Sequence, residues 1–503
     1  MNGFTLRISA LLVAASCLLD AGCAGLNRGK PNARASRGGA AVALPAAIGN
    51  PAQIHGPPVQ LAAHAAPAEP SQQPAKPLEI SFSSVLATVS GQNPQVAFAD
   101  ERIREAFAQY EAARVLWLPS IRAGVSYNRH DGTLQAVDGE VGEVSRSAME
   151  SGLGIGAAAA GSPPVPGVFA SFRLADAVFL PRAAGHVTTA RQSAATATTH
   201  DILLSAALGY LDLLRAFQQL AIAEETLQHA QQLADTTAAF ARTGQGSQAD
   251  ADRAEAELAL RNNELARARE STRVASARLT ELLSLDPAGV LVPQEPTVVP
   301  IDLVTHEIPL SQLVAQALSN RPELAESRDL VSAALDRLRR EQYAPLIPSV
   351  LLGVSYGGFG GGRGDSIANY RDRVDLDAGA YWELRNLGLG ERAARDGARS
   401  RLQQARLRQV QLMDQVAREV VEAHAQAESR RNQIAVAESG VKAAAASYQR
   451  NIERIRNARG LPLEALQSIQ ALDQSRREYL RAVADYNEAQ FRLHRALGWP
   501  IQP

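Results

Sequence analysis

One short stretch of this 503-residue sequence occurs twice. The string Pro119-Ser120, followed by Gly124-Val125-Ser126-Tyr127, returns 229 residues later as Pro348-Ser349, followed by Gly353-Val354-Ser355-Tyr356. A second pair lies 214 residues apart: Leu220-Ala221-Ile222-Ala223-Glu224 and Ile434-Ala435-Val436-Ala437-Glu438. Repeated strings in the same order identify an internal duplication. The offset falls by 15, so the first copy carries 15 extra residues, expected in a loop at 128–166 or at its strand ends.

Each copy is predicted to contain a helix, a strand, a loop, a second strand, a very long helix and a last helix. Alternating β-branched and aromatic residues indicate the strands. Long runs of Ala, Leu, Gln and Glu without proline indicate the helices. The predicted helices are 82–115 (with Pro94 in its first turns or at a break), 182–242, 250–283, 392–457 and 462–497, and the predicted strands are 120–129, 168–178, 350–356 and 374–383.

The helix lengths predict a tall bundle. At 1.5 Å per residue each long helix would measure about 90–100 Å, and two shorter helices of about 50 Å placed end to end would match it. Leu213, Leu220 and Leu227 are seven residues apart. This spacing is typical of coiled-coil seams, although a solitary antiparallel coiled coil would show it too. The strands favour the larger architecture.

The strands have the length of membrane-spanning β-strands, which is about 10 residues. Four strands cannot close a barrel, and an open sheet edge is not tolerated in lipid. Closure would therefore need further copies of the chain, and three copies would supply twelve strands. Aromatic residues at or near the strand ends fit a membrane-interface belt, or are ordinary strand aromatics; they are Trp117, Tyr127, Tyr356, Tyr370, Tyr381 and Trp382.

Composition excludes several classes of protein. The chain has 51 basic and 52 acidic residues, a balance that argues against a nucleic-acid partner. Its mean hydropathy of −0.14 excludes a polytopic helical membrane protein. The only cysteines are Cys17 and Cys23, and the nine histidines are scattered. We therefore expect no catalytic residues, no metal site and no cofactor.

The N-terminus has the features of an export signal. Arg7 precedes a short apolar segment at 8–19, and Ala-Gly before Cys23 resembles the end of a bacterial lipoprotein signal. Asp20 departs from that pattern. Cleavage by ordinary signal peptidase and lipidation at Cys17 are the alternatives. The expected organisation is a signal peptide at 1–22, a lipidated disordered tether at 23–78, a first repeat at 79–287, a linker at 288–308 and a second repeat at 309–503.

The chain resembles the TolC-like outer membrane efflux protein family over about residues 80–500. The resemblance rests on the duplication, the element order, the copy endings (Leu283-Ser284-Leu285-Asp286-Pro287 and Leu497-Gly498-Trp499-Pro500), and two Gly-containing turns. These turns are Thr243-Gly244-Gln245-Gly246-Ser247-Gln248-Ala249-Asp250 and Asn457-Ala458-Arg459-Gly460-Leu461-Pro462-Leu463-Glu464.

The resemblance implies a mainly α fold with membrane β-structure. A homotrimer would form a twelve-stranded barrel in the bacterial outer membrane, continuous with a twelve-helix periplasmic α-barrel. Such a protein is a passive exit duct of a tripartite efflux pump or type I secretion system. Its partners would be a periplasmic adaptor (membrane fusion protein), an inner-membrane pump and, through Cys23, outer membrane lipid. The alternative is a lipid-anchored periplasmic coiled-coil adaptor or structural protein, which would need a small β-domain between its helical arms.

The two turns are the candidate periplasmic tips. The resemblance implies adaptor docking at Gly244, Gly246, Ser247, Gly460 and Pro462. Simple helix capping explains the same residues, because Ser247 or Asp250 can accept a hydrogen bond from a free N–H of the following helix, and proline suits a first helical turn.

The resemblance also implies a charged entrance. Asp250 and Glu464 match acidic positions of the family and would form threefold rings in a trimer, which affect ion passage. Ile455 and Gly460 stand where the family can have a Tyr and an Arg. Arg456 and Arg459 are the candidate replacement partners for the two acids.

Overall fold

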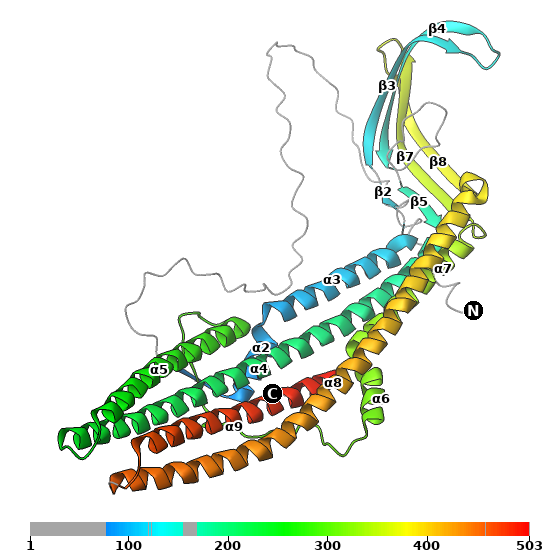
Figure 1. Ribbon diagram of the computed structural model, residues 1–503. Coiled ribbons are helices and arrows are strands. Elements are labelled where there is room, and N and C mark those ends of the chain that lie inside the picture. The colour runs from blue at the N-terminus through cyan, green and yellow to red at the C-terminus, as the bar shows by residue number, and fades with distance from the viewer. Residues whose placement is uncertain (1–76, 119, 122, 154–167, 458, 502–503) are drawn as a thin grey trace, which may run out of the picture. The chain divides into compact units, whose positions relative to one another are not determined.

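The computed structural model describes residues 77–118, 120–121, 123–153, 168–457 and 459–501, all within the unit Gln73–Pro503 (Figure 1). The first copy contains helices α2 (Phe82–Gln92), α3 (Pro94–Arg114), α4 (Leu174–Arg242) and α5 (Gln248–Leu283). The second copy contains α6 (Leu310–Asn320), α7 (Pro322–Tyr343), α8 (Leu389–Arg456) and α9 (Pro462–Ala496). Helix α4 packs against α3, α5, α7 and α9, so it joins the two copies.

The helix expected at 82–115 is two helices that meet at Asn93, so Pro94 marks a break. Proline has no N–H to donate within a helix, which suits the first position of α3. The Asn93 side chain accepts a hydrogen bond from the Gln95 N–H at 2.8 Å and donates to the Leu282 carbonyl at 3.0 Å. The second copy has the same break before Pro322.

The expected strand at 168–178 is shorter, because α4 begins at Leu174 and contains Pro181. The prediction was wrong for a physical reason. Ala175, Ala177 and Phe179 are buried and alternate with less buried neighbours, a period-2 pattern that looks like a strand. The long helices then have 69 residues in α4 and 68 in α8.

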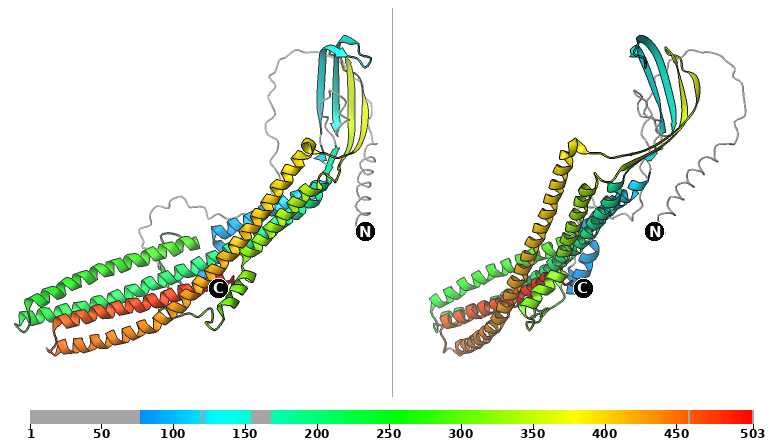
Figure 2. Two further views of the ribbon diagram at one scale, coloured as in Figure 1. Left: turned by 45° about the vertical axis from the view of Figure 1, so that its right-hand side comes forward. Right: turned by 90° about the vertical axis from the view of Figure 1, so that its right-hand side faces the viewer.

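One antiparallel sheet contains β2 (Ser120–Ile121), β3 (Ala123–Gln135), β4 (Val141–Leu153), β5 (Val168–Arg173), β7 (Ser349–Arg363) and β8 (Ala368–Tyr381). Strand β3 pairs with β4, β4 and β5 both pair with β7, and β7 pairs with β8. Figure 2 shows β3, β4, β7 and β8 side by side and bending together. The loop expected at 128–166 is therefore wrong, because most of β3 and all of β4 lie inside that range.

Strands β4 and β5 act as one interrupted strand beside β7. Leu153 of β4 pairs with Tyr356 and Val168 of β5 pairs with Val354, so the sequence has 154–167 where β7 has the single residue Ser355. Most of the extra length of the first copy is therefore inserted at this point of the ladder. The distal hairpin between β3 and β4 needs no part of it.

The glycine-rich end of β7 extends that strand beyond the expected 350–356. Its glycines accommodate Tyr370 of β8, whose ring would lie 2.3 Å and 2.8 Å from Cβ atoms added at Gly358 and Gly360. The Tyr370 hydroxyl bonds to Ser151 across β7. An aromatic ring covering strand glycines restores the contacts that they lack.

The two faces of the sheet differ in polarity. Val354, Tyr356, Val374 and Leu376 are exposed on one face, and Leu376 keeps 77% of its surface accessible. On the opposite face Arg373 lies 3.0 Å from Glu150 and 2.8 Å from Asp375. In the described part of the chain, the outer edges of β3 and β8 have no strand partner, so the sheet is open.

The segment between the two copies forms hydrogen bonds with both of them. Strand β1 (Leu78–Ile80) pairs in parallel with β6 (Leu291–Pro293). The Asn487 amide of α9 accepts from the Ile301 N–H and donates to the Val299 carbonyl, both at 2.8 Å. Burial and the hydrogen bond to Asp302 raise the pKa of Tyr486 to about 12. Among the described residues, no helix combines the length and apolar character needed to cross a membrane.

Candidate functional site

The first turn, between α4 and α5, is closed by backbone bonds to Phe240. Its carbonyl accepts from the Gln245 N–H at 2.9 Å and the Gly246 N–H at 3.0 Å. Gly244 has φ +72°, which favours glycine. A Cβ at Gly246 would lie 3.0 Å from the Phe240 Cβ, a tight contact that could be relieved only by a shift of a few tenths of an ångström. Ser247 caps α5 by accepting from the Ala249 N–H at 3.2 Å.

The second turn, between α8 and α9, uses the same design. The Arg459 N–H donates to the Arg454 carbonyl at 2.9 Å, and a Cβ at Gly460 would lie 3.1 Å from the Arg454 Cβ. Pro462 occupies the first turn of α9. Leu461 and Leu463 are exposed beside it.

The two turns lie next to each other at the same end of the helices (Figure 1). A small hollow separates the first turns of α5 and α9, and its lining comes from both copies. The lining residues are Leu233, Asp250, Arg253, Ala254, Pro462, Leu463 and Leu466. The structure thus brings the two sets of predicted tip residues together.

The predicted acidic residues have other partners within the chain than the arginines named from the sequence. Asp250 pairs with Arg253 at 3.3 Å, and Glu464 pairs with Arg454 at 2.9 Å. Within the described ranges neither Arg456 nor Arg459 forms an ion pair. Sequence reasoning missed both observed partners. The i,i+3 spacing from Asp250 to Arg253 could have indicated the first.

The predicted interfacial aromatics are all exposed, but two are not at strand ends. Tyr127 and Tyr356 lie well inside β3 and β7, because these strands are longer than expected. Tyr381 ends β8 and Trp382 follows it. Trp117 precedes β2 and its ring centroid lies 6.4 Å from that of Phe172. The proposed lipidation site, Cys23, lies outside the described residues.

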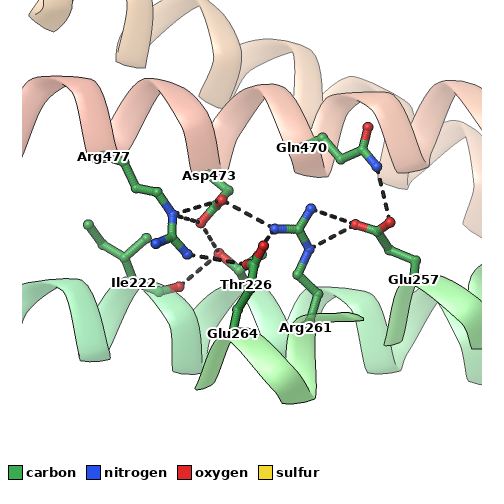
Figure 3. A network of polar contacts seen from close by, with 8 residues as sticks. All are labelled: Ile222, Thr226, Glu257, Arg261, Glu264, Gln470, Asp473 and Arg477. Carbon is green, nitrogen blue, oxygen red and sulfur yellow. Dashed lines mark hydrogen bonds and ion pairs between the residues drawn. The ribbon is translucent and has the colours of Figure 1, made fainter. Parts of the chain in front are cut away.

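Farther from the turns, a network of polar residues joins α4 and α5 to α9 (Figure 3). We call it the Arg261 network; besides Arg261 its side chains are Thr226, Glu257, Glu264, Gln470, Asp473 and Arg477. Arg261 lies 2.6 Å from Glu257, 2.7 Å from Glu264 and 3.3 Å from Asp473. Asp473 also accepts from the Thr226 hydroxyl at 3.1 Å and from Arg477 at 2.9 Å.

The network is buried at its centre, since the side chains of Arg261, Glu257 and Asp473 are at most 10% exposed. Burial alone would lower the pKa of Arg261, but the surrounding carboxylates, Glu257 first, outweigh it and raise that pKa. The network has no signature in the sequence, because its members come from three helices in two copies.

A second charged group joins α4, α7, α8 and α9. Arg495 lies 2.7 Å from Asp201 and 2.5 Å from Glu323. Arg321, just before α7, pairs with Glu323 and with Glu419 of α8. These ion pairs connect the start of α7 to α8 and α9, and α9 to α4.

Several residues of this junction have shifted pKa values, among them Glu323 and His494. Burial alone would raise the pKa of Glu323, but Arg495 and Arg321 outweigh it and hold that pKa below its ordinary value. Burial, together with the neighbouring His200, lowers the pKa of His494. The ring of His494 packs edge-on against Trp499 at 5.3 Å.

Comparison with known proteins identifies the fold. No protein-family model and no curated protein matches the sequence. The structure is similar to the outer-membrane channel OprN, with TM-score 0.70 and 18% identity over 84% of this chain and 91% of that one. It is similar to CusC, with TM-score 0.67 and 20% identity over 83% and 92%.

A third similar structure is the outer membrane protein VceC from Vibrio cholerae, with TM-score 0.67 and 17% identity over 83% of this chain and 96% of that one. These alignments cover nearly the whole length of each channel protein. The chain therefore has the fold of the TolC-like outer-membrane channels.

Proposed function

We propose that the chain is the outer-membrane exit channel of a tripartite efflux pump or type I secretion system. It is a passive duct for the export of small molecules. Three copies complete a twelve-stranded barrel in the outer membrane and a twelve-helix tunnel in the periplasm. A periplasmic adaptor and an inner-membrane pump deliver the cargo.

One observation carries the proposal most strongly. Within the described residues the sheet is open at β3 and β8, and its face with Val354, Tyr356, Val374 and Leu376 is apolar and exposed. A barrel of several copies would satisfy both edges and place the apolar face against lipid. The Arg373, Glu150 and Asp375 face would then line a water-filled lumen.

The adjacent turns are the proposed docking tips. Gly244, Gly246, Ser247, Gly460 and Pro462 shape them, and the nearby hollow lined from both copies offers the adaptor a place to bind.

The entrance itself is proposed to carry rings of Asp250 and Glu464. In a trimer, Arg456 and Arg459 of a neighbouring copy are available to these acids, since within the described part of one chain neither arginine has an ion-pair partner. Such ion pairs would narrow the entrance, and the acidic rings would affect ion passage through it.

The export signal and anchor complete the proposal. Cleavage after residue 22 would leave Cys23 to carry lipid, with a tether at 23–78 before the repeats at 79–287 and 309–503 and the linker at 288–308. Lipid on Cys23 would hold the chain at the inner face of the outer membrane.

The test is expression of the full chain, extraction of the outer membrane with detergent and comparison of gel mobility with and without heating. We expect a trimer that heat converts to monomer, and discrete conductance steps when the trimer is added to a planar bilayer. A monomer with no conductance would contradict the channel, and its release from the membrane by detergent but not by high salt would support the alternative of a lipid-anchored adaptor.

A further inference from the structure

The polar face of the sheet carries three basic residues side by side. Side chains alternate along a strand, so Arg146 lies on the same face of β4 as Glu150. In the registers of the sheet, Arg146 stands directly opposite His130 of β3 and directly opposite Arg363 of β7. We call His130, Arg146 and Arg363 the basic row. It crosses three neighbouring strands at the end of β7 that is farther from the helices (Figure 1).

The two arginines of the basic row repel each other. Directly opposite side chains of antiparallel strands have Cβ atoms about 5 Å apart, and like charges at such positions destabilise the pairing. Arg146 and Arg363 are exposed, and in the described part of the chain neither side chain forms an ion pair or a hydrogen bond. The Nε2 atom of His130 is buried there without a hydrogen-bond partner. Within the described chain, no acidic residue therefore compensates the row.

The opposite face of the sheet balances its charge at the same level. Arg129 precedes His130 in β3, so its side chain points to the other face. It pairs with Asp131 at 2.5 Å and with Asp365 of the turn that follows β7. One arginine on that face thus has two acidic partners, whereas the two arginines of the basic row have none among the described residues. The excess of positive charge is specific to the polar face.

The nearby carboxylates of the polar face are engaged elsewhere. Glu150 and Asp375 both pair with Arg373, and both lie closer to the helices than the basic row. Arg371, on the same face of β8, adds a further cation without an ion-pair partner in the described chain. Beyond the row, the positions of β3 and β4 on this face hold no acidic residue; they are Gly132, Leu134, Gly142 and Val144. The far end of the polar face is therefore positively charged.

We propose that the basic row is a binding site for a multivalent oxyanion, a compound that carries several phosphate groups. This inference rests on the proposed channel function, which places the polar face against the lumen and the row at its outer mouth. Arginine can donate two parallel hydrogen bonds to a phosphate, and rings of arginine or lysine are typical of anion and phosphate pores. Three copies would place three rows around one mouth, so an anion with several charges would contact more than one row and bind more tightly than a single phosphate.

The first test is block of the full-length channel in a planar bilayer by inositol hexakisphosphate. The long polar helices cannot cross the bilayer, so protein added to one side inserts with its outer mouth on the other. The probe on the mouth side should lower the single-channel conductance, and the block should weaken as KCl is raised, because salt screens the charges. Block from the mouth side alone would identify the outside solution as the source of the anion. Block from both sides that requires the basic row would identify a cargo.

The second test changes the basic row itself. Arg146→Gln with Arg363→Gln should raise the half-blocking concentration about tenfold or more, because hydrogen bonds between arginine and phosphate are lost. Arg146→Lys with Arg363→Lys keeps the charges and should retain most of the block. The matched control is Arg129→Gln, one residue from the row but on the opposite face, which should leave the block unchanged. The probe should also raise the melting temperature of the detergent-solubilised wild-type trimer, but not that of the glutamine variant.

The outcomes separate the two proposals. A wild-type protein that assembles no trimer and conducts no ions would overturn the channel itself. A conducting trimer that the probe does not block, or blocks equally after Arg146→Gln with Arg363→Gln, would overturn only the anion site. Asp138 and Glu140, in the turn between β3 and β4, are the other groups that a neighbouring copy could bring to the row. Block that appears only after Asp138→Asn with Glu140→Gln would show that these acids neutralise the row, and would also overturn the site.

Discussion

At the scale of single residues, the turns are determined by what a side chain would collide with. Gly246 and Gly460 each approach the last turn of the preceding helix closely, so an added Cβ would make a tight contact there, at 3.0 Å and 3.1 Å respectively. Ser247 then supplies the cap that starts α5. These roles follow from local chemistry, which is why the sequence alone could identify the turns and their caps.

The entrance rings give a prediction at this scale. Asp250→Ala with Glu464→Ala should raise the single-channel conductance severalfold and reduce the preference for cations, because three copies of each carboxylate would leave the entrance. Asp252→Ala is the control, since it removes an exposed carboxylate from the same turn of α5. Unchanged conductance and unchanged drug resistance in the double variant would remove the entrance hypothesis.

At the scale of elements, the sequence predicted most helices well and the strands less well. The long helices show through their length and lack of proline, and their ends differ from expectation mainly at α4. The strands were underestimated because polar residues such as Asn128, His130 and Asp131, and the glycines after Tyr356, look like loop residues. In the sheet these residues of β3 and β7 pair with β4 and β8, respectively. Such pairing depends on the tertiary structure and cannot be predicted from the local sequence.

Some features of the candidate site could likewise be predicted from the sequence, and others could not. The turns and their acidic residues were predictable, whereas the partners of those acids were not, because Arg454 reaches Glu464 across a chain reversal. The Arg261 network was invisible, since Asp473 follows Arg261 by 212 residues and only the packing of α5 against α9 brings them together.

The junction around His494 gives a prediction at the scale of elements. Its pKa in the folded protein is lowered, so between that value and the unfolded value of about 6.5 the unfolded chain binds more protons. The free energy of unfolding therefore decreases as the pH drops below about 6.5. The melting temperature of the detergent-solubilised protein should decrease from pH 7.5 to 5.5.

His494→Gln should make this decrease smaller, whereas His306→Gln, at an exposed position, should leave it unchanged. Glu323 does not contribute in this range, because its pKa is held below its ordinary value and its stabilisation is lost only at more acidic pH. An identical pH profile for wild type and His494→Gln would show that His494 is not the group responsible.

At the scale of the whole molecule, a single chain leaves an incomplete sheet. The apolar face and the two free edges have no partner among the described residues, and the proposed trimer would supply both. Leu376→Arg tests this, because a cation on the lipid face of a barrel costs about 2–4 kcal/mol near the middle of the bilayer. We expect less heat-modifiable trimer in the outer membrane fraction.

The control substitution is Arg371→Glu on the opposite face of the sheet. Side chains alternate along β8, so Arg371 lies on the same face as Arg373. It should leave assembly intact and alter ion selectivity instead. Equal amounts of trimer for Leu376→Arg and the wild type would indicate that this face does not contact lipid.

The parallel pair of β1 and β6 has a consequence for the order in which the chain folds. Leu78 pairs with Leu291, so β1 has no strand to join until the whole first copy has been made. Contacts of such high sequence separation form slowly, because a long loop must close before they contribute. The start of the body is thus tied down late, after the α4/α5 hairpin can form from neighbouring residues, and until then the N-terminal end of the first copy stays unpaired with β6.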